Sequence, residues 1–405
     1  MIEGRNIVCF ASGWSYHPTS KHHVMRGLAE HNHVVWVNWH SSRRPGLSLD
    51  DLKTMAGKLW QIQRGPRQAS DNITVTTPPQ LPLPSSAWAR KTNACLVRRA
   101  VRGILKQLPK RPVQLWSFAP DVSDLVGCFG EELALYYCVD AFGEFPGYDR
   151  ELIARLERKL IDRSDIVLTT SQPLYESKRP LHRNVRLVQH GVDHQHLSRA
   201  VTDNPIVPED LRRLPKPVFG FVGVVGEWVD LDLLAGLARR RPDASIVMIG
   251  PTSTPRIAGL PNIHWLGARS HQDLPNYLAG FDVGLIPFRQ VPLTHNANPI
   301  KLYEYLAAGV PVVSTPLPAV QPMPGSVWLA SSADRTAACC SEALRHNQPR
   351  DRLRRSRLMA AEAWTARLER ISQLVSDVLG SRTRPVPITP TGNPSREALL
   401  EPSLT

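Results

Sequence analysis

The chain has 405 residues, of which 42% are hydrophobic and 21% charged, values usual for a soluble globular protein of two or three domains. Its apolar runs are far shorter than the ~20 residues that cross a bilayer, and its start, MIEGRNIVCF, does not have the pattern of a signal peptide. We therefore expect a cytoplasmic protein. The formal net charge of +13 gives a surface that attracts nucleic acid, anionic lipid or a phosphorylated substrate.

Cysteine and histidine placement does not predict a metal site. The six cysteines form no CxxC pair and have no paired spacing, so we interpret them as reduced thiols. The histidines near the N-terminus are spread over a predicted loop, a helix and the following turn. They are His17, His22, His23, His31 and His33.

Strand and helix patterns alternate through the first 200 residues, which is typical of a parallel, doubly wound sheet. Strands are predicted at 5–12, 33–40, 112–119, 132–142, 165–171 and 185–191, and helices at 20–32 and 148–164. Residues 201–217 contain four prolines without a sustained apolar period and are predicted to be a linker.

The alternation then begins again. Strands are predicted at 217–226, 244–251, 262–268, 283–288 and 310–315, and helices at 229–242, 271–281 and 300–309. Residues 360–379 form an amphipathic helix, and the Pro-, Ser- and Thr-rich tail from 381 to 405 is predicted to be disordered. Two β–α series separated by one linker predict two Rossmann-like domains of the α/β class.

Glycines follow the first strand of the second series at Gly220, Gly223 and Gly226. Glycine lets backbone amides approach a phosphate at the carboxyl end of such a strand. The spacing differs from the GxGxxG of dinucleotide sites, which counts against a hydride-transfer enzyme. A tight strand-to-helix turn explains the glycines equally well, so both interpretations stay open.

The segment HNANPIKLYEYLAAGVPVVST, residues 295–315, predicts a more specific site. Pro299 fixes the entry to a helix on which Lys301 and Glu304 lie three positions apart, near one face. A lysine beside free backbone amides at a helix start suits a diphosphate, and a carboxylate one turn on can accept hydrogen bonds from ribose hydroxyls. The alternative for Lys301 and Glu304 alone is an ion pair on a solvated helix.

KLYEYLAAGVPVV at 301–313 resembles the nucleotide-sugar signature of the B-type glycosyltransferases, the large retaining bacterial group with two Rossmann-like domains. FVGVVGEW at 221–228 resembles the first turn of that group's C-terminal domain. NIHWLG and HQDLPNYL resemble its middle strand and helix, and VQHGVD at 188–193 its interdomain turn. The nearest members are teichuronic-acid-type and exopolysaccharide transferases.

The resemblance implies a domain organisation. Residues 1–200 would be the acceptor-side domain, 201–217 the linker, and 218–360 the domain that binds the nucleotide sugar. Residues 361–380 would form a helix that packs back on the N-terminal domain, ahead of the disordered tail.

The resemblance also implies a donor site without cofactor or metal, for a UDP- or GDP-linked sugar. Glu304 would bind the ribose, and Lys301 with the amides after Pro299 would face the diphosphate. We expect these residues to be joined by Gly223, Gly226, Asn296 and Asn298. Asn296 stands where the group usually has a glutamate, and Glu227 and Trp228 stand where it usually has an arginine and a lysine.

Asp140, at the end of a predicted N-terminal strand, is the candidate catalytic base, with Glu144 in reserve. A turn or N-cap carboxylate is an equal alternative for Asp140. Gly13, Trp14 and His190 are candidates for contacting the acceptor or lining the cleft.

A basic stretch at 86–111 has a separate interpretation. No acid occurs between Asn72 and Pro120, whereas eight basic residues do, with Trp88, Cys95, Leu96, Ala100, Ile104 and Leu108 recurring among them at helical spacing. Such a helix can lie on an anionic membrane. Peripheral contact at the inner face of the membrane, with access to a lipid-linked acceptor, is as strongly favoured as a merely solvated helix.

The expected function is transfer of a sugar from a nucleotide-sugar donor to a saccharide or lipid-linked acceptor in envelope or exopolysaccharide synthesis. The alternative enzyme is a nucleotide-sugar 2-epimerase of the same fold. A basic nucleic-acid-binding protein is the alternative from another class, but no zinc-finger or RRM-type pattern supports it, so no nucleic-acid partner is expected.

Overall fold

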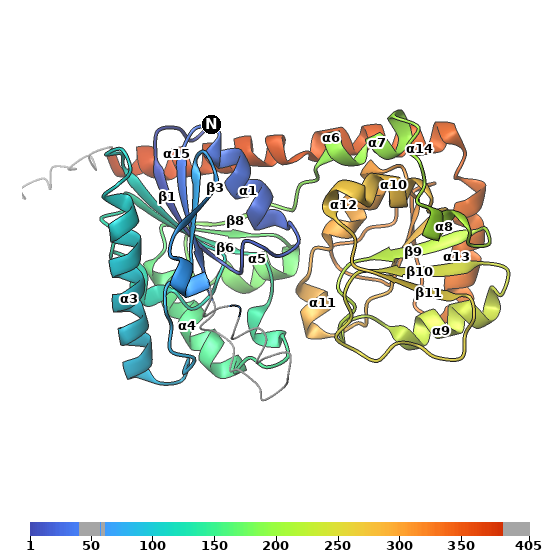
Figure 1. Ribbon diagram of the computed structural model, residues 1–405, viewed down its shortest axis with the longest axis horizontal. Coiled ribbons are helices and arrows are strands. Elements are labelled where there is room, and N and C mark those ends of the chain that lie inside the picture. Colours follow the sequence, from blue (N-terminus) through green and yellow to red (C-terminus); the bar gives the residue numbers. More distant parts are fainter. Residues whose placement is uncertain (40–56, 58–60, 384–405) are drawn as a thin grey trace, which may run out of the picture.

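The computed structural model describes residues 1–39, 57 and 61–383. Figure 1 shows two α/β domains side by side, with the long helix α15 (Trp364–Thr383) running along one side of the N-terminal domain. Each domain has its own central sheet and apolar core. The prediction of two doubly wound α/β domains is confirmed.

The N-terminal sheet has the strand order β3-β4-β2-β1-β5-β6-β7-β8, and all its pairings are parallel except that of β3 with β4. The strands are β1 (Asn6–Ala11), β2 (His33–Asn38), β3 (Arg67–Ser70), β4 (Ile73–Thr76), β5 (Val113–Ser117), β6 (Leu133–Cys138), β7 (Ile166–Thr169) and β8 (Val185–Leu187). In β1, Ile7 and Cys9 belong to the core on one face and Val8 and Phe10 to the core on the other. A strand covered on both faces is a nearly continuous apolar run, as β1 is after Asn6.

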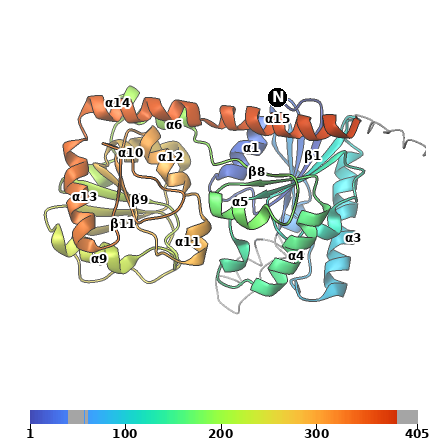
Figure 2. The ribbon, with the colours of Figure 1, turned by 180° about the vertical axis from the view of Figure 1, so that it is seen from behind.

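Helices cover both faces of this sheet. They are α1 (Ser20–Ala29), α3 (Ala87–Leu105), α4 (Arg150–Arg163) and α5 (Gln172–Lys178). The return of α15 to this domain requires Gly27 on α1, because a Cβ there would lie 2.2 Å from Cδ1 of Leu368 on α15. The final helix thus completes the core of the domain in which the chain began (Figure 2).

The C-terminal sheet is parallel with the order β11-β10-β9-β12-β13-β14, the doubly wound order in which ligands bind where the strand order reverses. Its strands are β9 (Val218–Val222), β10 (Ser245–Ile249), β11 (Ile263–Gly267), β12 (Val283–Ile286), β13 (Val312–Ser314) and β14 (Val327–Leu329). Its helices are α9 (Leu231–Arg240), α10 (Leu274–Ala279), α11 (Pro292–Asn296), α12 (Ile300–Ala307), α13 (Ala333–Arg345) and α14 (Pro349–Leu358). The order reverses between β9 and β12, next to the start of α12.

In chain order, three short helices come after the N-terminal sheet and before the C-terminal sheet. They are α6 (His194–Leu197), α7 (Arg199–Thr202) and α8 (Glu209–Arg212). The segment predicted as a linker, 201–217, is therefore partly helical. Leu211 is buried, and Asp210 pairs with Arg269 at 2.6 Å, so the segment is fixed to the C-terminal domain. At the other end of the molecule α15 continues to Thr383, past the predicted start of the tail, and residues 384–405 lie outside those described.

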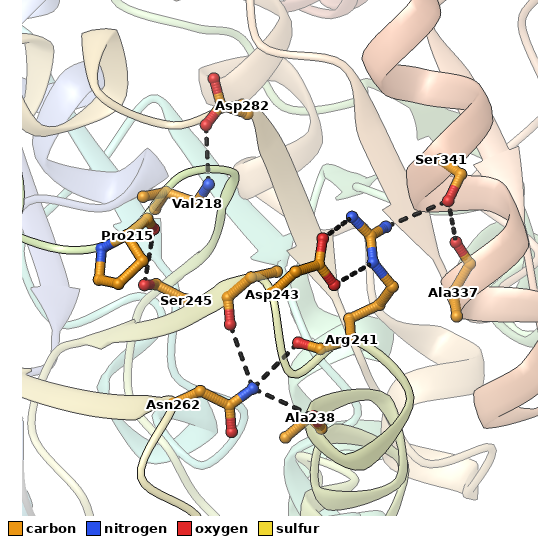
Figure 3. A network of polar contacts seen from close by, with 11 residues as sticks. Pro215, Val218, Ala238, Arg241, Asp243, Ser245, Asn262, Asp282, Ala337 and Ser341 are labelled. Carbon is orange, nitrogen blue, oxygen red and sulfur yellow. Dashed lines mark hydrogen bonds and ion pairs between the residues drawn. The ribbon is translucent and has the colours of Figure 1, made fainter.

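Paired polar groups close the amino end of the C-terminal sheet (Figure 3). The Asn262 amide donates to the carbonyls of Ala238, Arg241 and Ala244, each at 3.1 Å. The Arg241 guanidinium binds both carboxylate oxygens of Asp243, at 2.8 and 2.9 Å. Asn262, Arg241 and Asp243 thus form hydrogen bonds within the protein. We therefore look for a ligand site at the carboxyl end of the sheet.

Candidate active site at the domain interface

The carboxyl ends of the two sheets meet through direct contacts. The Ser171 hydroxyl after β7 donates to the backbone oxygen of Asn296 at 2.6 Å. The Phe145 ring, in the loop after β6, meets the Trp228 ring after β9 edge-on, 6.2 Å between centroids. Ile300, at the start of α12, packs against the N-terminal core. The loops in which the sequence predicted functional residues therefore meet at one interface.

Lys301 occupies the reversal point of the C-terminal sheet. Its side chain is half-buried, and Nζ lies 5.6 Å from the ring centroid of Phe221 and 5.8 Å from that of Phe288. Within the described part of the chain Nζ has no hydrogen bond or ion pair. Burial lowers the pKa of the ammonium, and the charges of Glu304 and Asp140 act in the opposite direction. Lys301 is therefore a desolvated cation that does not form the predicted alternative of a surface ion pair.

Gly223 lies against the end of the Lys301 side chain. A Cβ at this position would lie 2.3 Å from Cε of Lys301 and 2.7 Å from its Nζ, and the backbone φ of +142° also favours glycine. The glycine therefore makes room for the lysine at the end of β9. This contact favours a role in the site over a simple turn.

Gly226 is required by packing next to Trp228. A Cβ there would lie 2.4 Å from the indole ring, which itself faces Phe145 of the other domain. Gly226, which we expected in the donor site, thus makes room for an aromatic contact between the domains.

Glu304 lies one turn along α12 from Lys301 and is half-buried. Its carboxylate has no hydrogen bond or ion pair with any residue that the structure describes. Pro299 is the N-cap of this helix, and no side chain caps the first-turn amides. The start of α12 therefore presents a cation, a carboxylate and backbone amides together.

Asn296 and Asn298 make protein contacts through their amide nitrogens. The Asn298 amide is buried and donates to the Thr170 carbonyl of the N-terminal domain at 2.8 Å. The Asn296 amide donates to the Pro292 carbonyl at 2.7 Å. The segment before α12 lies against the loop after β7, so these two predicted donor ligands hold the domains and the α11 turn in place.

Asp140 follows β6 and is half-buried at the interface. Burial raises the pKa of its carboxyl from 3.8 to about 6, while the cations Lys21 and Lys301 act to lower it. Its carboxylate caps no helix and forms no ion pair among the described residues. A carboxyl with a pKa near neutrality, facing two lysines, has the properties of a general base.

Lys21 was not among the residues predicted from the sequence. It lies in the first turn of α1, at the carboxyl end of β1, and its side chain is half-buried. Burial lowers the pKa of its ammonium and the charge of Asp140 raises it. Lys21 follows β1 closely, as Gly13 does, and this position at the carboxyl edge of the sheet is the signal by which it could have been found.

The remaining acceptor-side candidates lie in other surroundings. The Trp14 ring packs on His22 and Trp36 and lines a surface depression with Arg26 at the outer edge of the N-terminal sheet. Gly13 is buried, and a Cβ there would meet the Tyr16 ring at 3.3 Å.

Glu144 and His190 also have structural contacts. The Glu144 carboxylate pairs with Arg150 at 2.9 Å. His190 is buried beneath α15, with its ring 6.2 Å from that of Trp364. Burial lowers the pKa of His190 to about 4, helped by the charge of Arg367, so its ring is neutral at pH 7.

The cysteines and histidines form no metal centre in the described residues. All six thiols are free, four of them buried. His17 and His23 lie 5.6 and 5.9 Å, ring centroid to ring centroid, from His271 of the other domain. His22 stacks on Trp36 at 4.9 Å.

Residues 216–346 match the family described as glycosyl transferases group 1. This match covers most of the C-terminal domain, including Lys301 and Glu304. A curated relative is TuaH of Bacillus subtilis (strain 168), whose name assigns it to teichuronic acid biosynthesis as a glycosyltransferase. The two are 28% identical over 229 residues, which are 52% of this chain and 57% of TuaH, so the match spans little more than half of that relative.

Solved glycosyltransferases share the whole two-domain fold. Sucrose-phosphate synthase from Thermosynechococcus elongatus superposes with a TM-score of 0.64 at 14% identity, over 93% of this chain and all of the other. HepE of Anabaena, in complex with UDP and glucose, superposes with a TM-score of 0.64 at 10% identity, over 91% of this chain and 99% of HepE. The E. coli trehalose-6-phosphate protein bound with UDP-2-fluoro glucose superposes with a TM-score of 0.60 at 11% identity, over 92% of this chain and 99% of the other. The fold is that of the B-type glycosyltransferases, as the sequence predicted.

Proposed function

We propose that the protein is a glycosyltransferase that takes a sugar from a nucleoside diphosphate held by the C-terminal domain and transfers it to an acceptor on the N-terminal domain. The observation that carries this proposal is the start of α12, where Lys301 is desolvated at the reversal point of the sheet with Glu304 one turn away. In a parallel doubly wound sheet this is the position at which nucleotides bind.

The geometry supports a displacement at the anomeric carbon. The bond from that carbon to the diphosphate oxygen breaks, and negative charge develops on the leaving group, where Lys301 and the uncapped amides of α12 stabilise it. The acceptor oxygen forms the new bond. Its proton passes to the Asp140 carboxylate, whose pKa of about 6 leaves it mostly ionised at pH 7.5 yet basic enough to accept a proton.

The donor is proposed to be a UDP- or GDP-linked sugar, bound without a metal ion. Two of the solved proteins of this fold are described with UDP or a UDP-sugar bound, and the curated relative is named for teichuronic acid biosynthesis. The product is accordingly proposed to be an envelope or exopolysaccharide, with a saccharide or a lipid-linked acceptor.

A thermal-shift screen of UDP- and GDP-sugars tests the donor site, because a ligand that binds the folded state raises Tm. We expect at least one nucleotide sugar to stabilise the protein while the free sugar does not. The stabilising compound is then incubated with the enzyme without acceptor. An unchanged sugar supports transfer, epimerisation at C2 identifies a 2-epimerase, and no stabilisation by any nucleotide sugar contradicts the proposal.

We further propose that α3 contacts an anionic membrane from the inner face. No described helix is long and apolar enough to cross a membrane. The exposed side of α3 carries Arg98, Arg99 and Arg102, with Trp88 67% exposed near its start. The apolar face predicted from the sequence is corrected in part, since Ile104 faces the core together with Val97. Attachment therefore rests on charge and on Trp88.

Liposome sedimentation tests the membrane contact. Attraction of about 1 kcal/mol per basic residue at the surface, screened over ~10 Å at 0.1 M salt, predicts pelleting with phosphatidylglycerol vesicles that fades as salt is added. Replacing both Arg98 and Arg99 with Glu should abolish pelleting, and the same replacement of Arg155 and Arg158 on the exposed face of α4 is the control of equal charge. Equal recovery in the supernatant with neutral and anionic vesicles at low salt would contradict the contact.

A further inference from the structure

We propose that Lys21 of the N-terminal domain binds the diphosphate of the donor together with Lys301, so that one cation from each domain holds the same anion. This inference rests on the proposed function and adds to it a residue on the other side of the interface. It assigns part of the donor site to α1, a helix to which the sequence gave no donor role.

The position of Lys21 places it beside the reacting groups. It stands in the first turn of α1, directly beyond the carboxyl end of β1. In the sheet β1 neighbours β5, and β5 neighbours β6, at whose end Asp140 lies. Asp140 in turn feels the charges of both Lys21 and Lys301. The start of α12, which carries Lys301, contacts the N-terminal domain through Ile300, so the three groups lie at the same domain interface.

The partners of Lys21 within the protein do not satisfy its charge. The ammonium has no hydrogen bond or ion pair with any described residue. Asp140 is the carboxylate that acts on it, and Asp140 is shared with Lys301. The neighbouring Cys9 thiol is buried, which raises its pKa and keeps it neutral. Two half-buried cations that share one carboxylate leave positive charge for a ligand, and a buried charge without a partner is costly unless a ligand supplies one.

A diphosphate fits this arrangement. The C-terminal domain has Glu227 and Trp228 after its first turn, so it provides no cation at that place. Lys301 alone supplies one positive charge from this domain's side of the interface, while a nucleoside diphosphate carries more than one negative charge. Lysine is a compact point charge that binds phosphate without a fixed geometry. Lys21, approaching from the opposite domain, supplies the second charge.

The test measures binding of UDP, GDP and uridine to the full chain by calorimetry. Lys21→Met should weaken binding of the preferred nucleoside diphosphate at least tenfold and leave any uridine binding unchanged, because uridine lacks phosphate. Lys21→Arg should stay within about threefold of the parent, since the charge is kept. Lys159→Met, which removes an exposed lysine from α4, controls for net charge.

The outcomes separate this inference from the proposed function. If the parent binds UDP or GDP and Lys21→Met binds it equally well, Lys21 does not contact the diphosphate, and the donor site stands without it. If the parent binds neither nucleotide, the proposed function fails and this inference with it. A folded Lys21→Arg protein, as judged by its Tm, that loses binding as severely as Lys21→Met would also overturn the assignment to charge.

Discussion

The charged residues at the amino edge of the C-terminal sheet and those at the start of α12 differ in how they are paired. At the amino edge Arg241 pairs with Asp243, and Lys216 pairs with Asp282 at 3.0 Å. At the carboxyl edge Lys301 and Glu304 are half-buried and have no such pairing in the described chain. A group that only stabilises the fold gains by being paired within it, whereas a group that binds a ligand must keep its charge available. The difference between these two groups of residues supports a ligand site at the start of α12 independently of the sequence resemblance.

The largest expected effect at the carboxyl side follows from replacing Asp140 with Asn. The amide keeps the shape of the side chain but cannot accept a proton, so turnover should fall by about 100-fold or more while nucleotide affinity changes little. Steady-state kinetics with the donor identified by the thermal-shift screen would measure this. Activity within a few-fold of the parent would make Asp140 structural and imply a reaction without a protein base.

Glu304→Ala should weaken donor binding with the fold intact. Losing a charged acceptor of ribose hydrogen bonds costs about 1.5–3 kcal/mol, which is on the order of tenfold to a hundredfold in affinity. Calorimetry with the nucleoside diphosphate measures it, with Glu342→Ala on α13 as a control of equal charge. Unchanged affinity would remove Glu304 from the site.

At the opposite edge, Asn262→Ala should lower stability and leave ligand binding unchanged. The amide donates to three carbonyls that would lose this partner, so the free energy of unfolding should fall by about 1–3 kcal/mol. Denaturant unfolding gives the stability, and calorimetry gives the nucleotide affinity. A variant that stays as stable as the parent but binds nucleotide poorly would reverse the assignment of the two edges.

A smaller, pH-dependent effect follows from the raised pKa of Asp140, which burial moves from 3.8 to about 6. Because the folded state favours the protonated carboxyl, its stabilising contribution is complete below about pH 4 and is lost as the pH rises through 6. Asp140→Asn should therefore gain at most about 3 kcal/mol of stability relative to the parent between pH 4 and pH 7.5. A stability difference that is constant over this range would show that the carboxyl is not desolvated.

Sequence patterns predicted the strands well, because strands buried on both faces are continuous apolar runs and the glycines and prolines between them mark the turns. The edge strand β3 and its neighbour β4 were missed; RQAS in β3 is exposed along its whole length, and β4 has only four residues. The helices α7 and α8 were missed because proline-rich composition outweighed single buried positions such as Leu211.

The candidate site was predicted in part. Lys301 and Asp140 lie at the same domain interface, with Glu304 one turn along the helix from Lys301, because strand ends and helix starts at the same sheet edge must converge. The contacts of Asn298 with Thr170 and of Trp228 with Phe145 depend on how two domains face each other, which no local pattern encodes. Lys21 was missed for the same reason, since its significance lies in its neighbours across the interface.

The chain passes between the domains twice, and the two passages touch. The Val192 amide donates to the Glu362 carbonyl at 2.9 Å, and the Trp364 amide donates to the Val192 carbonyl at 3.1 Å. Two adjacent connections, bonded to each other, restrict sliding of one domain along the other and leave rotation about a single axis through Val192 as the least hindered motion. Lys21 and Asp140 belong to one domain and Lys301 to the other, so such a rotation would change the separation of these proposed site residues.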